Sequence, residues 1–395
     1  MFSWLESLDI QSVFASFAEA GSELRFVGGC VRDSLLGKEV ADLDAATPLP
    51  PEQVIELFGQ TNSMADFKVI PTGLKHGTVT LVGDAVKIEI TTLRADKETD
   101  GRHATVAFSD SWEEDAARRD FTFNALYVDQ NKKVYDYYKG QEALKAGHVV
   151  FIGDAKQRIQ EDYLRILRFF RFWGRYGQGT PDAAALAACY DLAPAIKDLS
   201  KERIRDELFK ILASPSAVDV ISLMHPDILT HINRGPWRVD HFKDVAKAEE
   251  ILGLSSDPVR GMAALLDESS RTLQSWFALS NKQADRLDAI AADKMAGWQG
   301  KSKEEVLYKL SKTRLHDFAV FQCAHQPDLA ESLTDLLKLS KEWQQPVFPV
   351  SGHDLRAIGL SGPDLGKSLK NLEAQWIKDH FQPTKAQLLG MLPPY

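Results

Sequence analysis

Two carboxylates one residue apart, Asp42 and Asp44, stand in a segment DLD that follows a glycine pair and an arginine in the stretch GGCVRD. In an extended strand, residues i and i+2 point to the same face, so a strand over 40–45 would present both carboxylates side by side. Carboxylates held this close repel one another unless a cation compensates them. The spacing therefore predicts a site for a divalent metal, most naturally Mg²⁺.

The residues ahead of the carboxylates suit an anion. The apolar run 24–27 predicts a short strand, and Gly28 and Gly29 would let backbone N–H groups approach a phosphate at the start of a helix that carries Arg32. An isolated Asp-x-Asp pair is also compatible with an exposed loop. The order of strand, Gly-Gly turn, arginine-bearing helix and Asp-x-Asp strand resembles the palm of polymerase-beta-like nucleotidyltransferases, in which metals and glycine backbone hold a nucleoside triphosphate.

The composition is that of an ordinary globular protein. The chain has 395 residues, of which 44% are hydrophobic, enough for two or more domains. No apolar run is long enough to cross a bilayer, and segment 1–24 carries acidic residues where a secretory signal would have basic ones. We therefore expect a cytoplasmic protein with no membrane partner. The scattered Cys30, Cys189 and Cys323 predict buried thiols rather than a zinc site or disulfides.

One segment of the chain is positively charged although the whole chain is negatively charged. The net charge of −9 would argue against a nucleic-acid partner, but phosphate binding depends on local basic clusters. Segment 156–175 has two acidic residues, Glu161 and Asp162, against six cations: Lys156, Arg158, Arg165, Arg168, Arg171 and Arg175. This segment is the predicted phosphate-binding surface.

The pattern of the chain changes near its middle. Short β-rich runs at 77–82, 86–93, 104–108, 125–128 and 134–137 alternate with helical patches, whereas helical periodicity dominates from about residue 155. The predicted fold class is an α+β N-terminal polymerase-beta-like palm followed by an all-α C-terminal half. The predicted domains are a palm (1–140), a neck with a nucleotide-selecting helix (141–212), a helical body (213–345) and a helical tail (346–395).

The neck contains the residues best suited to reading a base. Segment 153–172 has a helical pattern, on which Asp162, Arg165, Arg168 and Arg171 would share related faces at i, i+3 and i+6 spacing. An Asp and an Arg together offer an acceptor and a fork of donors, as a base edge requires. Alternatively, Arg168 and Arg171 are solvated helix charges. The aromatic residues Phe169, Phe170, Phe172 and Trp173 are predicted to lie in the core. Ser200 is predicted to cap a helix that carries solvated charges at Lys201, Glu202, Arg203 and Arg205.

Several motifs together identify a family. GGCVRD with DLD, RRDFTFNAL, EDYLR and KERIRDELFKIL occur in the same order as the motifs of class II tRNA nucleotidyltransferases and of bacterial poly(A) polymerases, which they resemble. Segment 93–127 is especially similar to CCA-adding enzymes of the alphaproteobacterial and mitochondrial type. The strong resemblance covers 24–212, and segment 351–377 resembles the tRNA-contacting tail of the same family.

The resemblance implies specific roles. Asp42 and Asp44 would hold two Mg²⁺ ions for nucleotidyl transfer to the 3′-hydroxyl of tRNA, with release of pyrophosphate. Triphosphate contacts would come from Gly28, Gly29 and Arg32; base selection of CTP and then ATP from Asp162 and Arg165; phosphate contacts from Arg119, Arg168 and Arg171; and ribose or metal-shell contacts from Asp120 and Asn124. The third carboxylate of the superfamily is either Glu89 or Asp120.

We therefore expect template-independent addition of CCA to tRNA from CTP and ATP, with shape and backbone recognition of the acceptor arm. A poly(A) polymerase, or an enzyme that adds only CC or only A, would share the motifs. The presence of segment 93–108 and the absence of a long basic C-terminal extension favour full CCA addition. A non-catalytic RNA-binding protein is the alternative of another class. The pairs His316-Asp317 and His353-Asp354 lack the further ligands that a metal phosphohydrolase needs. The oligomeric state is not predicted.

Overall fold

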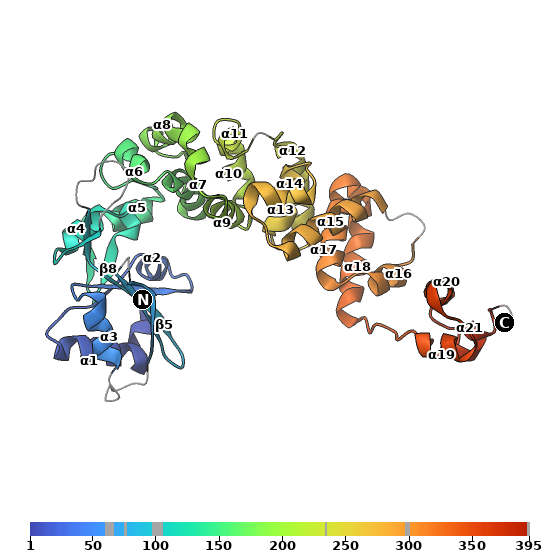
Figure 1. The fold of residues 1–395 in the computed structure, drawn as a ribbon. Helices are drawn as coiled ribbons and strands as arrows, with labels where there is room; N and C mark the ends of the chain where they lie inside the picture. Colours follow the sequence, from blue (N-terminus) through green and yellow to red (C-terminus); the bar gives the residue numbers. More distant parts are fainter. Residues whose placement is uncertain (60–66, 75–76, 97–105, 234, 297–300, 393–395) are drawn as a thin grey trace. The chain divides into compact units, whose positions relative to one another are not determined.

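The computed structural model describes residues 1–59, 67–74, 77–96, 106–233, 235–296 and 301–392. The chain forms two compact units, Met1–Glu207 with Leu223–Asn233 and Leu208–Ser222 with Arg234–Tyr395. All strands that the structure describes belong to the first unit, and the second is built from helices, apart from a single-residue bridge between Trp237 and Leu266 (Figure 1). The fold class predicted from the sequence is confirmed. The finer division into palm, neck, body and tail stays a prediction.

A seven-stranded mixed sheet organises the first unit, with the strand order β3-β4-β5-β2-β1-β8-β9. Strand β2 runs parallel to β5 and antiparallel to β1. A separate two-stranded sheet pairs β6 with β7. The strands are β1 (Arg25–Val27), β2 (Leu43–Thr47), β3 (Lys68–Gly73), β4 (Thr78–Val82), β5 (Lys87–Thr92), β6 (Arg94–Asp96), β7 (Val106–Phe108), β8 (Leu126–Val128) and β9 (Val134–Asp136).

Helices surround the sheet and then continue the chain. The helices up to residue 212 are η1 (Ser3–Glu6), α1 (Leu8–Glu19), α2 (Gly29–Leu35), α3 (Pro51–Gly59), α4 (Trp112–Ala117), η3 (Thr122–Asn124), α5 (Gly140–Ala146), α6 (Ala155–Glu161), α7 (Leu164–Tyr176), α8 (Ala183–Leu192), η4 (Ala193–Asp198) and α9 (Lys201–Leu212). The later helices are α10 (Ala217–Met224), α11 (Leu229–Ile232), α12 (Val239–Ile251), α13 (Pro258–Leu265), α14 (Ser270–Phe277), α15 (Asn281–Ala296), α16 (Lys303–Lys309), α17 (Lys312–His325), η5 (Pro327–Leu329), α18 (Ala330–Glu342), α19 (Gly352–Ala357), α20 (Gly362–Lys378) and α21 (Lys385–Leu389).

The apolar face of the sheet packs against α1. Phe26 of β1 lies 5.6 Å, ring to ring, from Phe14 of α1, and it pairs in register with Ala45 of β2. Ala45 in turn pairs with Ile90 of β5. Because successive strand residues point to opposite faces, Asp44 and Glu89 lie on the other face of the sheet. The hydrophobic alternation thus leaves the carboxylates on the face away from α1.

The structure corrects three local predictions. Strand β2 begins at Leu43, so Asp42 precedes the strand and only Asp44 lies within it. Strands β3 and β6 were not predicted, and of the expected strand 104–108 the first two residues lie outside the described residues. The single helix expected over 153–172 is wrong, because α6 ends at Glu161 and α7 begins at Leu164.

The break between α6 and α7 has a local cause. Asp162 has an extended backbone, with φ −155° and ψ 105°, and its side chain accepts a hydrogen bond from the backbone N–H of Leu164 at 3.1 Å. Asp side chains bonded to nearby backbone in this way compete with helix continuation. Asp162 therefore lies off the helix that carries the three arginines.

Other sequence predictions are confirmed. Phe169, Phe170 and Phe172 are buried in the core, whereas Trp173 is half-buried. All three cysteines are buried free thiols. The Ser200 hydroxyl accepts the N–H of Arg203 at the start of α9, as expected of an N-cap. In the part of the chain that the structure describes, no helix is long and apolar enough to span a membrane.

Candidate active site

The carboxylates predicted to bind metal lie on neighbouring strands. Asp44 of β2 pairs in parallel register with Glu89 of β5, so the two side chains leave the same face of the sheet. Both Asp42 and Asp44 are exposed to solvent. The pKa of Asp44 is raised, first by partial burial and then by the nearby Glu89 carboxylate, with a further contribution from Asp42 and an opposing one from Arg119. The carboxylates thus repel one another in the absence of a bound cation.

The donor set fits a divalent cation in its chemistry. Carboxylate oxygens are hard ligands of the kind that Mg²⁺ prefers. Among the described residues, however, no three His, Cys, Asp or Glu side chains already converge on a common point. Glu89 instead forms an ion pair with Lys87 at 2.8 Å, and both side chains are solvent-exposed. A metal at this face would therefore share the Glu89 carboxylate with Lys87 or displace that lysine.

The glycine turn lies between β1 and α2. Gly28 has φ 76° and ψ −119°, a conformation that L side chains rarely adopt, and it is the N-cap of α2. A Cβ at this position would lie 3.6 Å from the carbonyl oxygen of Asn124 and 3.8 Å from Nη1 of Arg119. Because the first N–H groups of a helix have no partner within the helix, the turn offers donors to an anion beside the Arg119 guanidinium.

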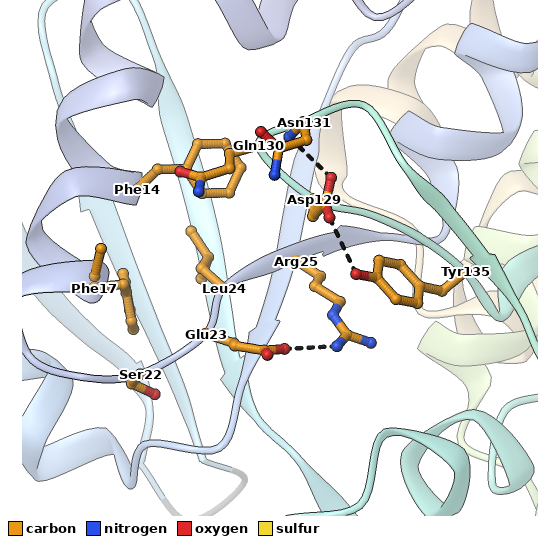
Figure 2. A pocket seen from close by; sticks show the side chains of 11 residues that line it. Phe14, Phe17, Ser22, Glu23, Leu24, Arg25, Asp129, Gln130, Asn131 and Tyr135 are labelled. Atoms are coloured by element: carbon orange, nitrogen blue, oxygen red, sulfur yellow. Dashed lines mark hydrogen bonds and ion pairs between the residues drawn. The ribbon is translucent and has the colours of Figure 1, made fainter.

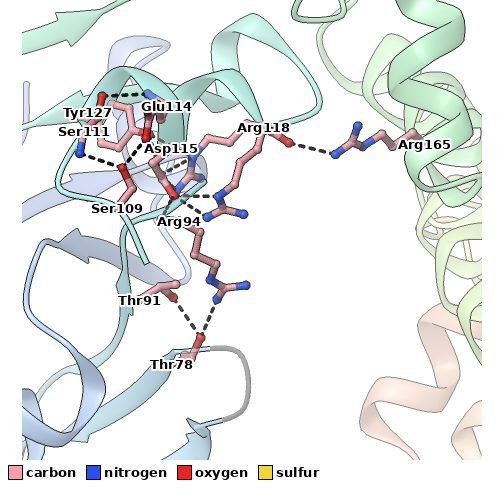
Figure 3. Close-up of polar contacts among 11 residues, drawn as sticks. Thr78, Thr91, Arg94, Ser109, Ser111, Glu114, Asp115, Arg118, Tyr127 and Arg165 are labelled. Carbon is pink, nitrogen blue, oxygen red and sulfur yellow. Dashed lines mark hydrogen bonds and ion pairs between the residues drawn. The ribbon is translucent and has the colours of Figure 1, made fainter. Parts of the chain in front are cut away.

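Arg119 is held in place by a buried acid. The Asp115 side chain is 1% exposed and accepts hydrogen bonds from Arg119 at 3.0 Å, from Arg118 at 2.5 Å and from the Tyr127 hydroxyl at 2.8 Å (Figure 3). Burial acts to raise the pKa of Asp115, but the two guanidinium groups and the tyrosine hydroxyl outweigh it and hold that pKa well below its usual range. Asp115 therefore stays ionised and fixes Arg119 near the turn.

Arg32 is enclosed by protein rather than exposed to solvent. Its side chain is 8% exposed, and it donates from Nε to Asp33 at 2.9 Å and from Nη1 to Asn124 at 2.5 Å. The guanidinium also lies 4.5 Å from the centre of the Tyr176 ring. Arg32 thus donates two hydrogen bonds to neighbouring protein groups. Of the two arginines predicted to contact the phosphates, Arg119 is the more exposed to solvent.

Asp120 and Asn124 belong to one buried network with Arg168. Arg168 donates to Asp120 at 2.7 Å, and the Asn124 amide donates to the other oxygen of the same carboxylate at 2.9 Å. Burial acts to raise the pKa of Asp120, but Arg168 and the hydrogen bonds lower it overall. Arg168 is therefore not a plain solvated charge, and the same holds for Arg171, which donates to the buried Glu207 at 2.5 Å.

Asp162 and Arg165, the predicted base-reading pair, have separate partners. Asp162 forms an ion pair with Arg203 at 2.7 Å, so Arg203 is not merely a solvated charge. Arg165 pairs with Glu161 at 2.7 Å and donates to the backbone carbonyl of Arg118 at 2.9 Å (Figure 3). A carboxylate accepts about four hydrogen bonds and a guanidinium donates five, so both groups keep capacity for a ligand.

A pocket of about 210 Å³ lies elsewhere in the first unit (Figure 2). Phe14 and Phe17 line one part of it and Arg25 and Asp129 another. Arg25 is held between the rings of Trp112 and Tyr135, at 4.0 and 3.8 Å from their centres. None of the residues predicted for catalysis or nucleotide binding lines this pocket, so it is separate from the candidate active site.

Sequence reasoning missed several residues that shape the site. Asp115 could have been found, because it precedes Arg118 and Arg119 by three and four residues in a helical segment, the spacing of helix ion pairs. Tyr176 donates its hydroxyl to Asp33 at 2.7 Å across 143 residues of sequence, and no local pattern signals that contact.

The fold and site define the class of protein. A family model described as "Poly A polymerase head domain" matches residues 24–150, which include the glycine turn and the carboxylates. A second, "Probable RNA and SrmB- binding site of polymerase A", matches residues 180–232. The mixed sheet with Asp44 and Glu89 on one face is thus the head of a nucleotidyltransferase of this type.

Relatives that match over nearly the whole chain identify the family within this class. The chain is 36% identical to "CCA tRNA nucleotidyltransferase 1, mitochondrial" of Homo sapiens, over 98% of this chain and 92% of that protein. It is 38% identical to the "CCA-adding enzyme" of Leuconostoc mesenteroides, over 93% of this chain and 91% of that protein. The chain belongs to the family of CCA tRNA nucleotidyltransferases, as its motifs predicted, and membership implies use of a divalent metal.

Solved structures agree on the fold. The Bacillus stearothermophilus CCA-adding enzyme in complex with CTP has a TM-score of 0.73 at 24% identity and covers 95% of this chain and 94% of its own. The Thermotoga maritima CCA-adding enzyme complexed with tRNA has a TM-score of 0.66 at 19% identity, covering 97% of this chain and 94% of its own.

Proposed function

We propose that this nucleotidyltransferase adds CCA to the 3′ end of tRNA without a nucleic-acid template, using CTP and ATP and releasing pyrophosphate. Asp42 and Asp44 are the metal ligands and catalytic carboxylates. The observation that carries this assignment is the gathering of carboxylates on one sheet face beside the glycine turn, where partial burial and then the neighbouring Glu89 and Asp42 carboxylates raise the pKa of Asp44.

Glu89 is the third carboxylate in this proposal, rather than Asp120. Glu89 pairs with Asp44 across two neighbouring strands, and its side chain forms an ion pair with the exposed Lys87. Asp120 is buried and already accepts from Arg168 and Asn124, so recruiting it to a metal would break a satisfied network.

Mg²⁺ bound by Asp42 and Asp44 would activate the tRNA 3′-hydroxyl and neutralise charge on the departing pyrophosphate. The chain's own groups orient the nucleotide. The N–H groups at the start of α2, from Gly29 onward, and the guanidinium of Arg119 bind the triphosphate, whereas Gly28 donates its own N–H to the Leu126 carbonyl at 3.1 Å and shapes the turn. Arg32 supports this turn from within the protein, through Asn124.

Asp162 and Arg165 select the base. The Asp162 carboxylate accepts from an exocyclic amine and Arg165 donates to ring and carbonyl acceptors, a combination that suits cytosine and adenine and opposes uracil and guanine. Both side chains keep unused hydrogen-bonding capacity beside their present partners. Arg168 positions Asp120 and Asn124 for the ribose, and Arg171 adds positive charge near the phosphates.

The partner is the acceptor arm of tRNA, recognised through its backbone. The first unit contributes the basic segment 156–175, and the family model for an RNA-binding site covers residues 180–232. The cytoplasm is the predicted location, although the human relative is named as mitochondrial.

The proposal is tested with Asp42→Ala and Asp44→Ala, and Asp84→Ala serves as a matched control because Asp84 is an exposed aspartate between β4 and β5. Both site variants should lose transfer of CMP and of AMP while keeping the circular dichroism spectrum of the parent. They should also lose binding of Mn²⁺ measured by calorimetry. Retention of more than a few per cent of activity in a folded Asp42→Ala protein would contradict the metal assignment.

A further inference from the structure

Side chains from three segments of the first unit form a chain of hydrogen bonds that begins and ends on α7. It joins α2, the segment around η3, and two points of α7. Its members are Asp33, Arg32, Asn124, Asp120, Arg168 and Tyr176, which we call the hydrogen-bonded ring.

The ring is continuous. The Tyr176 hydroxyl donates to Asp33 at 2.7 Å, and Arg32 donates to the same Asp33 oxygen at 2.9 Å. Arg32 also donates to the side-chain oxygen of Asn124 at 2.5 Å, and the Asn124 amide donates to Asp120 at 2.9 Å. Arg168 donates to the other oxygen of Asp120 at 2.7 Å. Arg168 and Tyr176 both belong to α7, so the helix itself closes the ring.

Most of the ring is out of contact with water. Asp33, Asn124, Asp120 and Tyr176 are each 7% exposed, and Arg168 is the most accessible member, with 30% of its side chain exposed. A buried polar group that loses its partner is not rescued by solvent. Arg175 also approaches Asp33, but at 3.3 Å and from an exposed side chain, so it replaces the Tyr176 contact poorly.

The ring fixes α7 at two places. Arg168 and Tyr176 are eight residues apart. That separation is about 12 Å along a helix. Two polar anchors at that distance add to the buried aromatic packing of α7 and constrain both its position and its rotation. Arg165, which is proposed to select the base, is one turn before the Arg168 anchor.

We propose that Tyr176 and Asp33 are positioning residues for nucleotide selection, because they hold the C-terminal end of α7 and so help to set the orientation of the helix that carries Arg165 relative to the glycine turn that binds the triphosphate. The inference rests on the proposed function. Neither residue is proposed to contact the nucleotide. Tyr176 holds Asp33, and Asp33 in turn holds Arg32 and thereby α2. A displacement of about 1 Å between two binding elements can cost up to about a hundredfold in rate.

The test is Tyr176→Phe, which removes the hydroxyl and keeps the ring over Arg32. The KM for CTP and ATP should rise roughly tenfold, the effect of losing a hydrogen bond to a charged group, with a smaller change in kcat. Misincorporation of UTP relative to CTP should rise several-fold. The matched control is Tyr190→Phe, since Tyr190 donates its hydroxyl to the carbonyl of Leu223 at 3.0 Å outside the hydrogen-bonded ring.

A second variant separates positioning from general destabilisation. Asp33→Asn loses the carboxylate that Tyr176 and Arg32 share, so its effect and that of Tyr176→Phe should not add in the double variant. Tyr190→Phe loses a hydrogen bond to a neutral carbonyl, so it should lower the melting temperature by no more than Tyr176→Phe and should not change nucleotide choice. Additive effects in the double variant would show that the two residues act independently and would contradict the inference.

Two outcomes are distinguishable. If the parent protein adds CMP and AMP but Tyr176→Phe keeps KM within twofold and rejects UTP as the parent does, the inference is overturned and the proposed function stands. If the parent protein transfers neither nucleotide to tRNA, the proposed function fails and the inference falls with it.

Discussion

The ion cluster around Asp115 gives a prediction whose size follows from the structure. Asp115 is 1% exposed and is shared by Arg118, Arg119 and Tyr127. The substitution Asp115→Asn keeps the shape of the side chain, removes its charge and points an amide donor at two guanidinium groups. Removing one partner of a buried ion pair typically costs about 3–5 kcal/mol. At about 2–4 °C per kcal/mol for a unit of this size, the melting temperature should fall by roughly 6–20 °C.

The assay is thermal unfolding at pH 7 followed by circular dichroism. The matched control is Asp110→Asn, because Asp110 is an exposed aspartate just before α4. Surface substitutions of this kind usually change stability by less than about 0.5 kcal/mol. An Asp115→Asn protein that melts within about 2 °C of the parent would refute the view that this carboxylate is an essential partner of the arginines.

The same cluster predicts a pH dependence. The pKa of Asp115 is lowered in the folded protein, so its stabilising contribution is complete above the ordinary aspartate pKa of about 3.9 and is lost as the pH falls. The difference in unfolding free energy between the parent and Asp115→Asn should therefore shrink between about pH 5 and pH 3. A difference that stays constant over that interval would contradict the assigned charge state.

Three further predictions concern the reaction and the partner. Asp162→Ala should relax discrimination against UTP and GTP by about ten- to a hundredfold in single-nucleotide incorporation; undiminished rejection would show that the base is read elsewhere. Glu89→Gln should abolish most transfer whereas Lys87→Ala, which frees the Glu89 carboxylate, should not; equal rates in the two variants would exclude Glu89 as the third carboxylate. Affinity for tRNA should fall steeply between about 50 and 200 mM salt, and insensitivity to salt would indicate another partner.

Local sequence patterns predicted the head of the molecule well. The strand before Gly28, the turn itself and the exposed carboxylate face all depend on residues close together in the sequence, where the alternation of strand residues is readable. The pairing of Asp44 with Glu89 needed the sheet order, which places β5 beside β2 rather than beside β1. The sequence alone therefore left Glu89 and Asp120 as equal candidates.

Segment 153–176 shows where such patterns fail. The apolar period of 153–172 continues through Asp162, so the pattern predicts one helix, yet the Asp162 side chain bonds to the Leu164 N–H and ends α6. The partners of Arg168 and Tyr176 lie 48 and 143 residues away. Contacts this distant in sequence carry no local periodicity and become visible only in the folded structure.

This site is proposed to make the sequence CCA on tRNA. The most direct measurement is sequencing of the 3′ ends formed when the purified protein is incubated with a tRNA that lacks its 3′ terminus, together with Mg²⁺, CTP and ATP. We expect a CCA end on which addition stops, and a CC end when only CTP is supplied. A run of adenosines, a CC end in the presence of ATP, or an unextended tRNA would each contradict that expectation.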